Sequence, residues 1–291
     1  MQNKEANTIS QDQWDISIEP KTAMFNLNLK ELWRYKDLMW LFVKRDFSAQ
    51  YKQTILGPLW HFIQPLFTTI VFLVVFGQIA KIPIPKNIAP AVFYMSGITI
   101  WNYFTSCLTG TSNTFVANAA IFGKVYFPRL VIPVSVVLSN IVKFSIQFLL
   151  LLLVMGYYGI KTGNFYIGWT WLLIPVLVVM MALMGLGFGI IISSLTTKYR
   201  DFTVLIGFAI QLLMYATPVI YPLEYFNNSK YKPFIEWNPL TPIIEAFRYA
   251  VLGEGTFTIT SLLYSSSFIL VSVFFGSMIF TKVEKSFMDT V

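Results

Sequence analysis

Six long apolar runs divide the chain, and polar segments separate them. They cover residues 58–79, 91–112, 130–157, 169–195, 202–220 and 259–280. Runs of this kind are typical of membrane-spanning helices, because a hydrocarbon core about 30 Å thick needs about 20 residues of helix. The pattern predicts an all-α integral membrane protein with six transmembrane helices.

Composition supports this class. Hydrophobic residues make up 56% of the 291 residues and charged residues only 12%, whereas a soluble domain carries roughly 25% charged residues. The single cysteine, Cys107, excludes an internal disulfide and a multi-cysteine metal site. In a membrane protein the net charge of +7 is interpreted as a topology signal and not as nucleic-acid binding. We therefore expect neither a metal nor a nucleic-acid partner.

Lys and Arg set the expected orientation. Fourteen of the 21 Lys and Arg residues fall on one side of the six runs, six fall on the other side, and Lys143 lies within a run. Because the side richer in Lys and Arg usually stays in the cytoplasm, both termini are expected there.

Two segments precede the first run: a polar extension over residues 1–28 and a charged segment over residues 29–55. On a helical wheel the second segment has one mainly polar stripe, formed by Lys30, Arg34, Asp37, Arg45, Ser48 and Lys52. Leu32, Tyr35, Met39, Phe42 and Val43 lie opposite. This pattern predicts an amphipathic helix in the membrane surface, either as a simple anchor or as a contact for a cytoplasmic partner. Gly57-Pro58 then separates it from the six-span region, residues 56–291.

The third run carries a polar stripe of four residues spaced by four: Ser135, Ser139, Lys143 and Gln147. Polar groups inside a bilayer usually face a bundle interior or a wet cavity. The alternative is that Lys143 reaches to the interface while the serines only permit close packing. Gln147 lies deeper along the stripe and favours the cavity.

Two other runs carry polar or small residues. The second run contains Trp101, Asn102, Tyr103, Ser106 and Thr109. This face either lines a pathway or makes ordinary hydrogen bonds between helices. In the fourth run Gly185, Gly189 and Ser193 are spaced by four, which predicts close approach of two helix backbones.

The fifth run ends early. Pro218 follows 16 residues after Phe202, and Pro222 comes soon after. A helix of 16 residues is about 24 Å long, which is shorter than the hydrocarbon core. Tyr215 and Tyr221 flank the break. The orientation places this break near the outer face of the membrane.

The segment after the fifth run contains its own short helix. Thr241-Pro242 opens it with a hydroxyl cap and a first-turn proline, and Gly253 follows its end. Glu245 and Arg248, three residues apart, are expected to pair. The two charges make this helix a poor span, so we expect it to dip partway into the outer leaflet.

The sequence offers no energy source of its own. No glycine-rich phosphate-binding motif with a following Lys-Ser or Lys-Thr occurs. The single histidine, His61, has no nearby carboxylate, which argues against a histidine-based membrane transferase. No acidic residues cluster within a run, which argues against proton coupling through a carboxylate relay. A transporter built this way needs a separate motor.

Five fragments, in order, resemble the permease subunits of type-2 ABC exporters: FVKRDFSAQYKQTILGPLWHFIQP, IFGKVYFPRLVIP, TTKYRDF, YATPVIYP and WNPLTPIIEAFRY. They look most like bacterial permeases that export lipid-linked O-antigen, capsule or teichoic acid across the inner membrane. The resemblance runs from about residue 29 to the C-terminus. It implies a dimer of two copies with two ATPase subunits, which use ATP and Mg while this chain binds no cofactor.

The resemblance also implies roles for particular segments. Residues 117–125 would form a coupling helix seated on the ATPase, with candidate contacts Ala117, Asn118, Ile121, Phe122 and Lys124. Residues 29–55 would be the interface helix. The segment between the fifth and sixth spans would form re-entrant structure, with Pro218, Pro222, Glu245 and Arg248 as candidate residues.

A polymer would pass between the two copies along an aromatic lining. Candidate lining residues are Trp101, Tyr103, Ser139, Lys143, Gln147, Tyr215 and Tyr221. Aromatic rings offer sugars a flat apolar face with polar partners at the edge. Two other functions stay open: a type-2 exporter of drugs or lipids, and a membrane enzyme or scaffold that translocates nothing.

Overall fold

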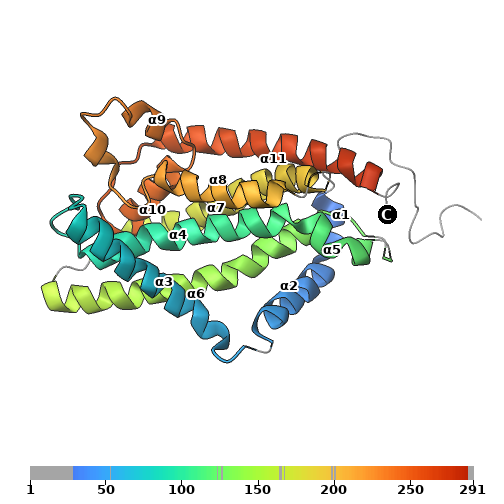
Figure 1. Ribbon diagram of the computed structural model, residues 1–291, viewed down its shortest axis with the longest axis horizontal. Coiled ribbons are helices and arrows are strands. Elements are labelled where there is room, and N and C mark those ends of the chain that lie inside the picture. Colours follow the sequence, from blue (N-terminus) through green and yellow to red (C-terminus); the bar gives the residue numbers. More distant parts are fainter. Residues whose placement is uncertain are drawn as a thin grey trace, which may run out of the picture.

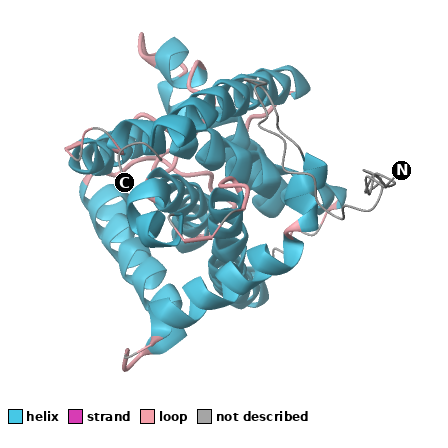
Figure 2. Ribbon diagram, turned by 90° about the vertical axis from the view of Figure 1, so that its right-hand side faces the viewer, coloured by secondary structure: helices cyan, strands magenta, loops and turns pink. Residues whose placement is uncertain are grey.

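The chain folds into a helical bundle, seen from the side in the computed structural model of Figure 1 and along its length in Figure 2. The described residues are 29–52, 54–122, 124–125, 127–163, 166, 168–197, 199 and 201–287. Within these residues every regular element is a helix, which confirms the expected all-α class. The expected extension over residues 1–28 lies outside the described residues.

Four stretches are long and apolar enough to cross a membrane: Gly57–Ile79, Val131–Thr162, Trp169–Thr196 and Ile259–Val283. They correspond to the first, third, fourth and sixth predicted spans. The elements that form them are η2 (Gly57–Leu59), α3 (Trp60–Phe72), the π-helix η3 (Leu73–Ile79), α6 (Val131–Thr162), η4 (Trp169–Leu172), α7 (Leu173–Thr196) and α11 (Ile259–Phe287).

The other two predicted spans are also helices, but they are weaker candidates. The second is α4 (Pro90–Ser112), which has 23 residues and carries several polar side chains. The fifth is α8 (Phe202–Tyr215), which has only 14 residues. Length and composition therefore support four spans among the described residues, and the count of six stays a prediction.

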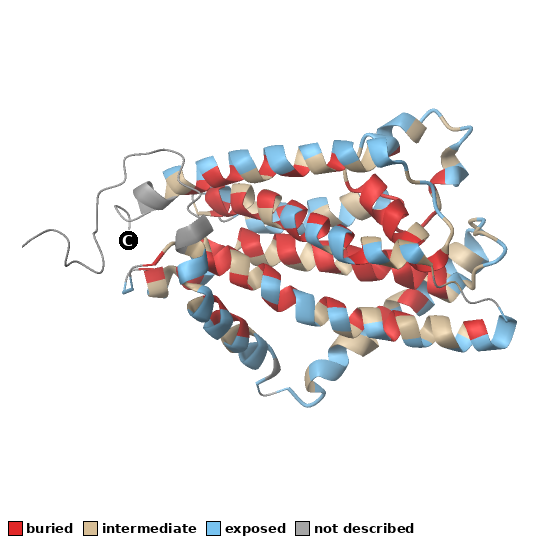
Figure 3. Cartoon of the chain, turned by 180° about the vertical axis from the view of Figure 1, so that it is seen from behind, coloured by how far each residue is buried: buried red, intermediate tan, exposed pale blue. Residues whose placement is uncertain are grey.

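Helix α7 packs between α4 and α11 through small residues. A methyl group on Gly185 would lie 2.7 Å from Cβ of Cys107 in α4, and one on Gly187 would lie 2.6 Å from Oγ of Ser272 in α11. The hydroxyl of Thr196 also donates to the Ser112 carbonyl at 2.9 Å. These contacts confirm the predicted close packing of the fourth run and leave Cys107 fully buried. Figure 3 shows buried residues concentrated on the helices in the middle of the bundle.

The amphipathic segment is two helices, α1 (Leu29–Arg34) and α2 (Lys36–Tyr51), because the backbone of Tyr35 is not helical (φ −94°, ψ 21°). On α2 the predicted apolar face is buried: Met39, Phe42 and Val43 are at most 6% exposed. They face the bundle, and Phe42 packs on Phe127 with ring centroids 5.8 Å apart. The apolar face thus packs on the protein, and its placement in a membrane surface stays a prediction.

Short elements follow α8 at the opposite end of the bundle from α1 and α5 (Thr114–Phe122) (Figure 1). They are η5 (Leu223–Phe226), α9 (Lys232–Glu236) and α10 (Thr241–Leu252). Helix α10 ends at Gly253 in the left-handed region (φ 74°), as the glycine predicts. The expected hydroxyl cap is wrong: Thr241 is already helical, and its hydroxyl donates to the Ile235 carbonyl at 2.7 Å.

Candidate functional site

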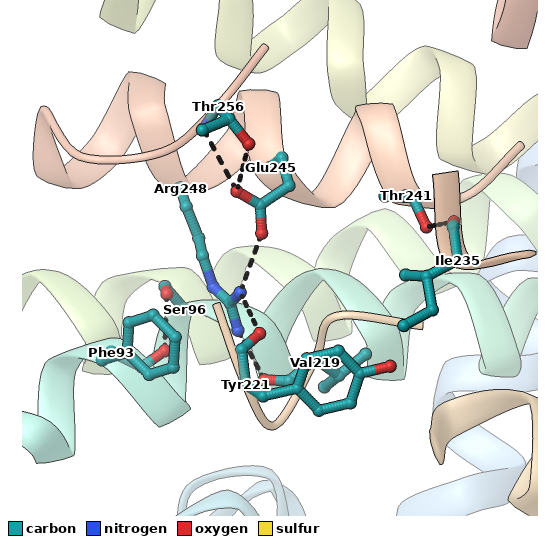
Figure 4. Close-up of polar contacts among 9 residues, drawn as sticks. All are labelled: Phe93, Ser96, Val219, Tyr221, Ile235, Thr241, Glu245, Arg248 and Thr256. Carbon is teal, nitrogen blue, oxygen red and sulfur yellow. Dashed lines mark hydrogen bonds and ion pairs between the residues drawn. The ribbon is translucent and has the colours of Figure 1, made fainter. Parts of the chain in front are cut away.

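An ion pair holds the loop after α8 onto α10 (Figure 4). Arg248 lies 3.2 Å from Glu245, as their spacing predicts, and their side chains are only 2% and 3% exposed. The guanidinium also donates to the carbonyls of Val219 and Tyr221 and lies over the Phe93 ring at 4.1 Å. Arg248 therefore joins α10, the loop after α8 and α4 in one cluster.

The second oxygen of Glu245 accepts from the segment after α10. Its Oε2 atom receives the backbone N–H of Thr256 at 3.2 Å. A buried charge pair is stable only when its remaining hydrogen-bonding groups are satisfied, and here backbone groups from two segments do this: the loop after α8 and the segment after α10. The sequence predicted the pair but not its backbone partners, since these lie 11 to 29 positions away from the residues they bond.

The early end of the fifth run lies beside this cluster. Helix α8 ends at Tyr215, three residues before Pro218 and five before the predicted end of the span. Pro218 is buried and Pro222 is half-buried. The hydroxyl of Tyr221 donates to the Tyr215 carbonyl at 2.9 Å and so closes the turn.

The two tyrosines differ in exposure. Tyr215 is 54% exposed, whereas Tyr221 is 8% exposed and packs against Phe226 at a centroid distance of 4.9 Å. Only Tyr215 therefore offers its ring to a ligand or to another chain. The side chain of Tyr221 instead stabilises the loop after α8.

The polar stripe of α6 borders a cleft between α2, α4 and α6. Ser139 and Lys143 line this cleft, which has a volume of about 280 Å³. Gln147 lies one turn further along and accepts a hydrogen bond from Asn102 of α4 at 3.3 Å. Two of the four stripe residues thus line a cleft, whereas Gln147, which favoured the cavity, makes a hydrogen bond between helices instead.

Trp101 and Tyr103 lie inside the bundle. They are 3% and 2% exposed, and their rings pack on Phe104 and Phe144 at centroid distances of 5.5 and 5.1 Å. A lining residue has to reach a surface of the single chain, and these two do not. Within one chain they contribute to the core.

The predicted coupling segment is helix α5, which begins three residues earlier than expected and ends at Phe122. Ala117 and Lys124 are exposed, Ile121 is half-buried, and Asn118 and Phe122 are buried. Asn118 kinks the helix (φ −118°, ψ 16°). The candidate contacts thus divide into an exposed set and a set that holds α5 in place.

Asn118 connects α5 with α2. Its side-chain oxygen accepts from Nη2 of Arg45 at 3.3 Å, while its amide nitrogen donates to the Thr114 carbonyl at 3.0 Å. Arg45 also pairs with Asp46 at 2.7 Å and lies over the Phe42 ring at 4.7 Å. The sequence did not predict this connection, because it depends on how two distant helices pack.

The family of the chain follows from comparison with known proteins. Residues 37–252 match the family model described as ABC-2 type transporter. The chain belongs to this family. The matched region of this ABC-2 type transporter chain extends from α2 to the end of α10 and includes α5, the polar cleft and the Arg248 cluster.

Curated relatives agree with this membership. The ABC-2 type chain is 29% identical to the O-antigen export system permease protein RfbA of Klebsiella pneumoniae, over 87% of this chain and 94% of the relative. It is 27% identical to the protein of the same name from Myxococcus xanthus, over 76% and 82%. It is 24% identical to the polysialic acid transport protein KpsM of Escherichia coli, over 84% and 93%.

Proposed function

We propose that this chain is the permease subunit of an ATP-driven exporter that moves lipid-linked polysaccharide across the bacterial cytoplasmic membrane. Two copies pair, each binds one ATPase subunit, and the ATPase uses ATP and Mg. The observation that carries the proposal is the similarity to O-antigen export permeases over 94% of their length. The family match over residues 37–252 includes α5 at one end of the bundle and the Arg248 cluster at the other.

The arrangement of the helices supports different roles for the two ends of the bundle. Helix α5 lies at one end of the bundle, where Ala117 within it and Lys124 and Val125 just after it are exposed. Helix α10 and the loop after α8 lie at the other end. In the proposed orientation α5 meets the ATPase in the cytoplasm, and the Arg248 cluster lies at the outer side, with six spans and both termini cytoplasmic.

Exposed apolar faces are available for lipid and for a second copy. On α8, Val204 is 78% exposed, and Leu205, Phe208 and Leu212 are between 54% and 59% exposed. A soluble monomer rarely exposes such a continuous apolar face. In the proposed dimer, part of this face meets hydrocarbon and part meets the partner copy or the channel, with Tyr215 at its outer end.

Deletion of the gene tests the function. We expect loss of surface polysaccharide with accumulation of its lipid-linked form in the cytoplasm, restored by the wild-type gene. Purification of the tagged full chain should recover an ATPase. Unchanged surface polysaccharide together with drug-stimulated ATPase activity would favour a drug or lipid exporter. A chain that recovers no ATPase would instead be an enzyme or scaffold.

A further inference from the structure

A polar cleft lies between the surface helix α2 and two helices of the bundle. Its volume is about 280 Å³, close to the lower end of small-ligand sites, which run from about 300 to 1,000 Å³. Its walls are Asp46, Phe47 and Gln50 of α2, Ser106, Thr109 and Gly110 of α4, and Val136, Ser139, Asn140 and Lys143 of α6. No residue of α5 or of the loop after α8 lines this cleft.

Two side chains in the cleft have donor capacity that the described part of the chain does not use. The ammonium group of Lys143 makes no hydrogen bond or ion pair with a described residue, although it lies within a predicted span. Oγ of Ser139 is buried and has no hydrogen-bond partner in the described residues, and the whole residue is only 8% exposed. A buried polar group without a partner is costly, so this pair of donors indicates a missing acceptor.

The charge balance favours an anion as that acceptor. Asp46 is the acidic residue of the cleft wall, but its Oδ1 atom already accepts two hydrogen bonds from Arg45, at 2.9 and 2.7 Å. Asp46 also attracts Lys143, but the two cations Arg45 and Lys143 then share one carboxylate, so a net positive charge remains. Ser106 adds a further hydroxyl to the wall. An ammonium with nearby hydroxyl donors suits the oxygens of a phosphate group.

The surface next to the cleft suits a hydrocarbon chain. Phe47, at the cleft wall, is 37% exposed, and Trp40 is 59% exposed. Because they are seven residues apart, they lie on the same face of α2. Towards the bundle interior, the hydrogen bond between Asn102 and Gln147 lies one helical turn beyond Lys143. A bound molecule would therefore have its polar end in the cleft and its apolar part along α2.

We propose that this cleft binds a phosphate group carried by a lipid, held by Lys143 and Ser139. The proposal rests on the proposed function, in which the exported polysaccharide is linked to a lipid. Two lipid sources share this chemistry: an isoprenoid pyrophosphate and an ordinary anionic phospholipid. The site would receive the lipid end of the substrate, separately from the path of the polymer.

Equilibrium binding to the purified full chain, with its co-purifying partner in detergent, tests the proposal. The probe is radiolabelled geranylgeranyl pyrophosphate. We expect K143Q to weaken binding at least tenfold, equivalent to about 1.4 kcal/mol, and S139A to weaken it about three- to tenfold. K143R should retain most of the affinity, because the charge remains. K161Q and S145A, on exposed positions of the same helix, are matched controls and should bind as the wild type.

Three competitors distinguish the sources. Unlabelled geranylgeraniol should not displace the probe, because it lacks phosphate. Displacement by phosphatidylglycerol would support an ordinary phospholipid as the source, and no displacement would support an isoprenoid carrier. Inorganic pyrophosphate binding as tightly as the probe would overturn the lipid assignment.

Unchanged binding in both K143Q and S139A would overturn the site itself. S139A keeps the test decisive if K143Q fails to fold, which elution volume and thermal midpoint would reveal. The assay measures binding and not export, so its failure is distinguishable from failure of the proposed function. A chain that exports no polysaccharide can still show a Lys143-dependent phosphate site.

Discussion

Arg248 and Glu245 form a buried ion pair 3.2 Å apart that also ties two other segments to α10. The pair lies three residues apart on one helix, yet its other contacts reach Val219, Tyr221 and Thr256. Loss of either charge would leave the other uncompensated in an apolar setting. The pair therefore determines the shape of the loop after α8.

Replacement of Arg248 by Met should strongly destabilise the chain. We expect a loss of roughly 3–5 kcal/mol in the free energy of unfolding, because Glu245 and two carbonyls lose their partner. Thermal and denaturant unfolding in detergent measure this. The exposed pair between Lys232 and Glu236, 3.5 Å apart, is the matched control, and K232M should cost at most about 1 kcal/mol. Equal effects of R248M and K232M would contradict the structural role of the buried pair.

Replacement of Gly97 by Ala should also destabilise this end of the bundle. The added methyl group would lie 2.5 Å from the Val219 carbonyl oxygen and 2.8 Å from Nη2 of Arg248. We expect a cost of roughly 1–3 kcal/mol, as for other overpacked sites. G207A is the control, because no atom lies within 4 Å of its new methyl group. If G97A unfolds at the same temperature as G207A, α4 does not pack on the loop as described.

The two tyrosines at the end of α8 should respond differently to removal of their rings. Y221A should lower the free energy of unfolding by roughly 3–5 kcal/mol, because its ring is buried. Y215A should leave stability within about 0.5 kcal/mol, because its ring is half exposed. If Tyr215 contacts the polymer, Y215A lowers surface polysaccharide at normal chain abundance. Normal export by Y215A would remove it from the proposed lining.

The connection between Arg45 and Asn118 should matter for coupling more than for folding. R45Q removes the 3.3 Å contact between α2 and α5, and we expect normal recovery of the chain with its ATPase but lower export per ATP hydrolysed. A partly exposed pair contributes only about 1 kcal/mol or less to stability. K44Q is the control, since Lys44 is exposed and lies near Trp40 of its own helix. Equal coupling in R45Q and K44Q would exclude the role.

Lys124 tests the proposed ATPase contact. It is exposed just after α5, so K124E should leave the fold intact. We expect several-fold lower recovery of the ATPase with the tagged chain. Groups on the ATPase that attract the positive charge of Lys124 would repel a negative charge at the same position. The control is K161E, which makes the same charge change at the far end of α6, away from the proposed contact. Full recovery of the complex with K124E would refute this assignment.

The sequence predicted the long helices because their apolar runs match the length that a bilayer needs. It predicted the pair between Glu245 and Arg248 and the close packing at Gly185, since both depend on spacing within one helix. It placed the break of the fifth run at Pro218, whereas α8 already ends at Tyr215, whose carbonyl accepts a hydrogen bond from the Tyr221 hydroxyl. Local patterns therefore predicted the elements better than their ends.

Features that depend on packing between helices were not predictable in this way. Trp101 and Tyr103 carry polar groups on large rings, and the same residues suit a lining or a core. Their burial depends on the positions of α6 and α10, which no local pattern contains. The cleft beside Lys143 needs Asp46 and Gln50 from a helix almost one hundred residues earlier. The sequence located the polar faces of α4 and α6 but not the wall that α2 forms.

The position of Cys107 has a practical consequence. It is the only cysteine in the chain, and in the folded protein its thiol is fully buried where α7 packs on α4. A maleimide added to the folded chain should therefore react only with cysteines introduced elsewhere. Reaction at Cys107 itself would report the moment at which α4 and α7 separate.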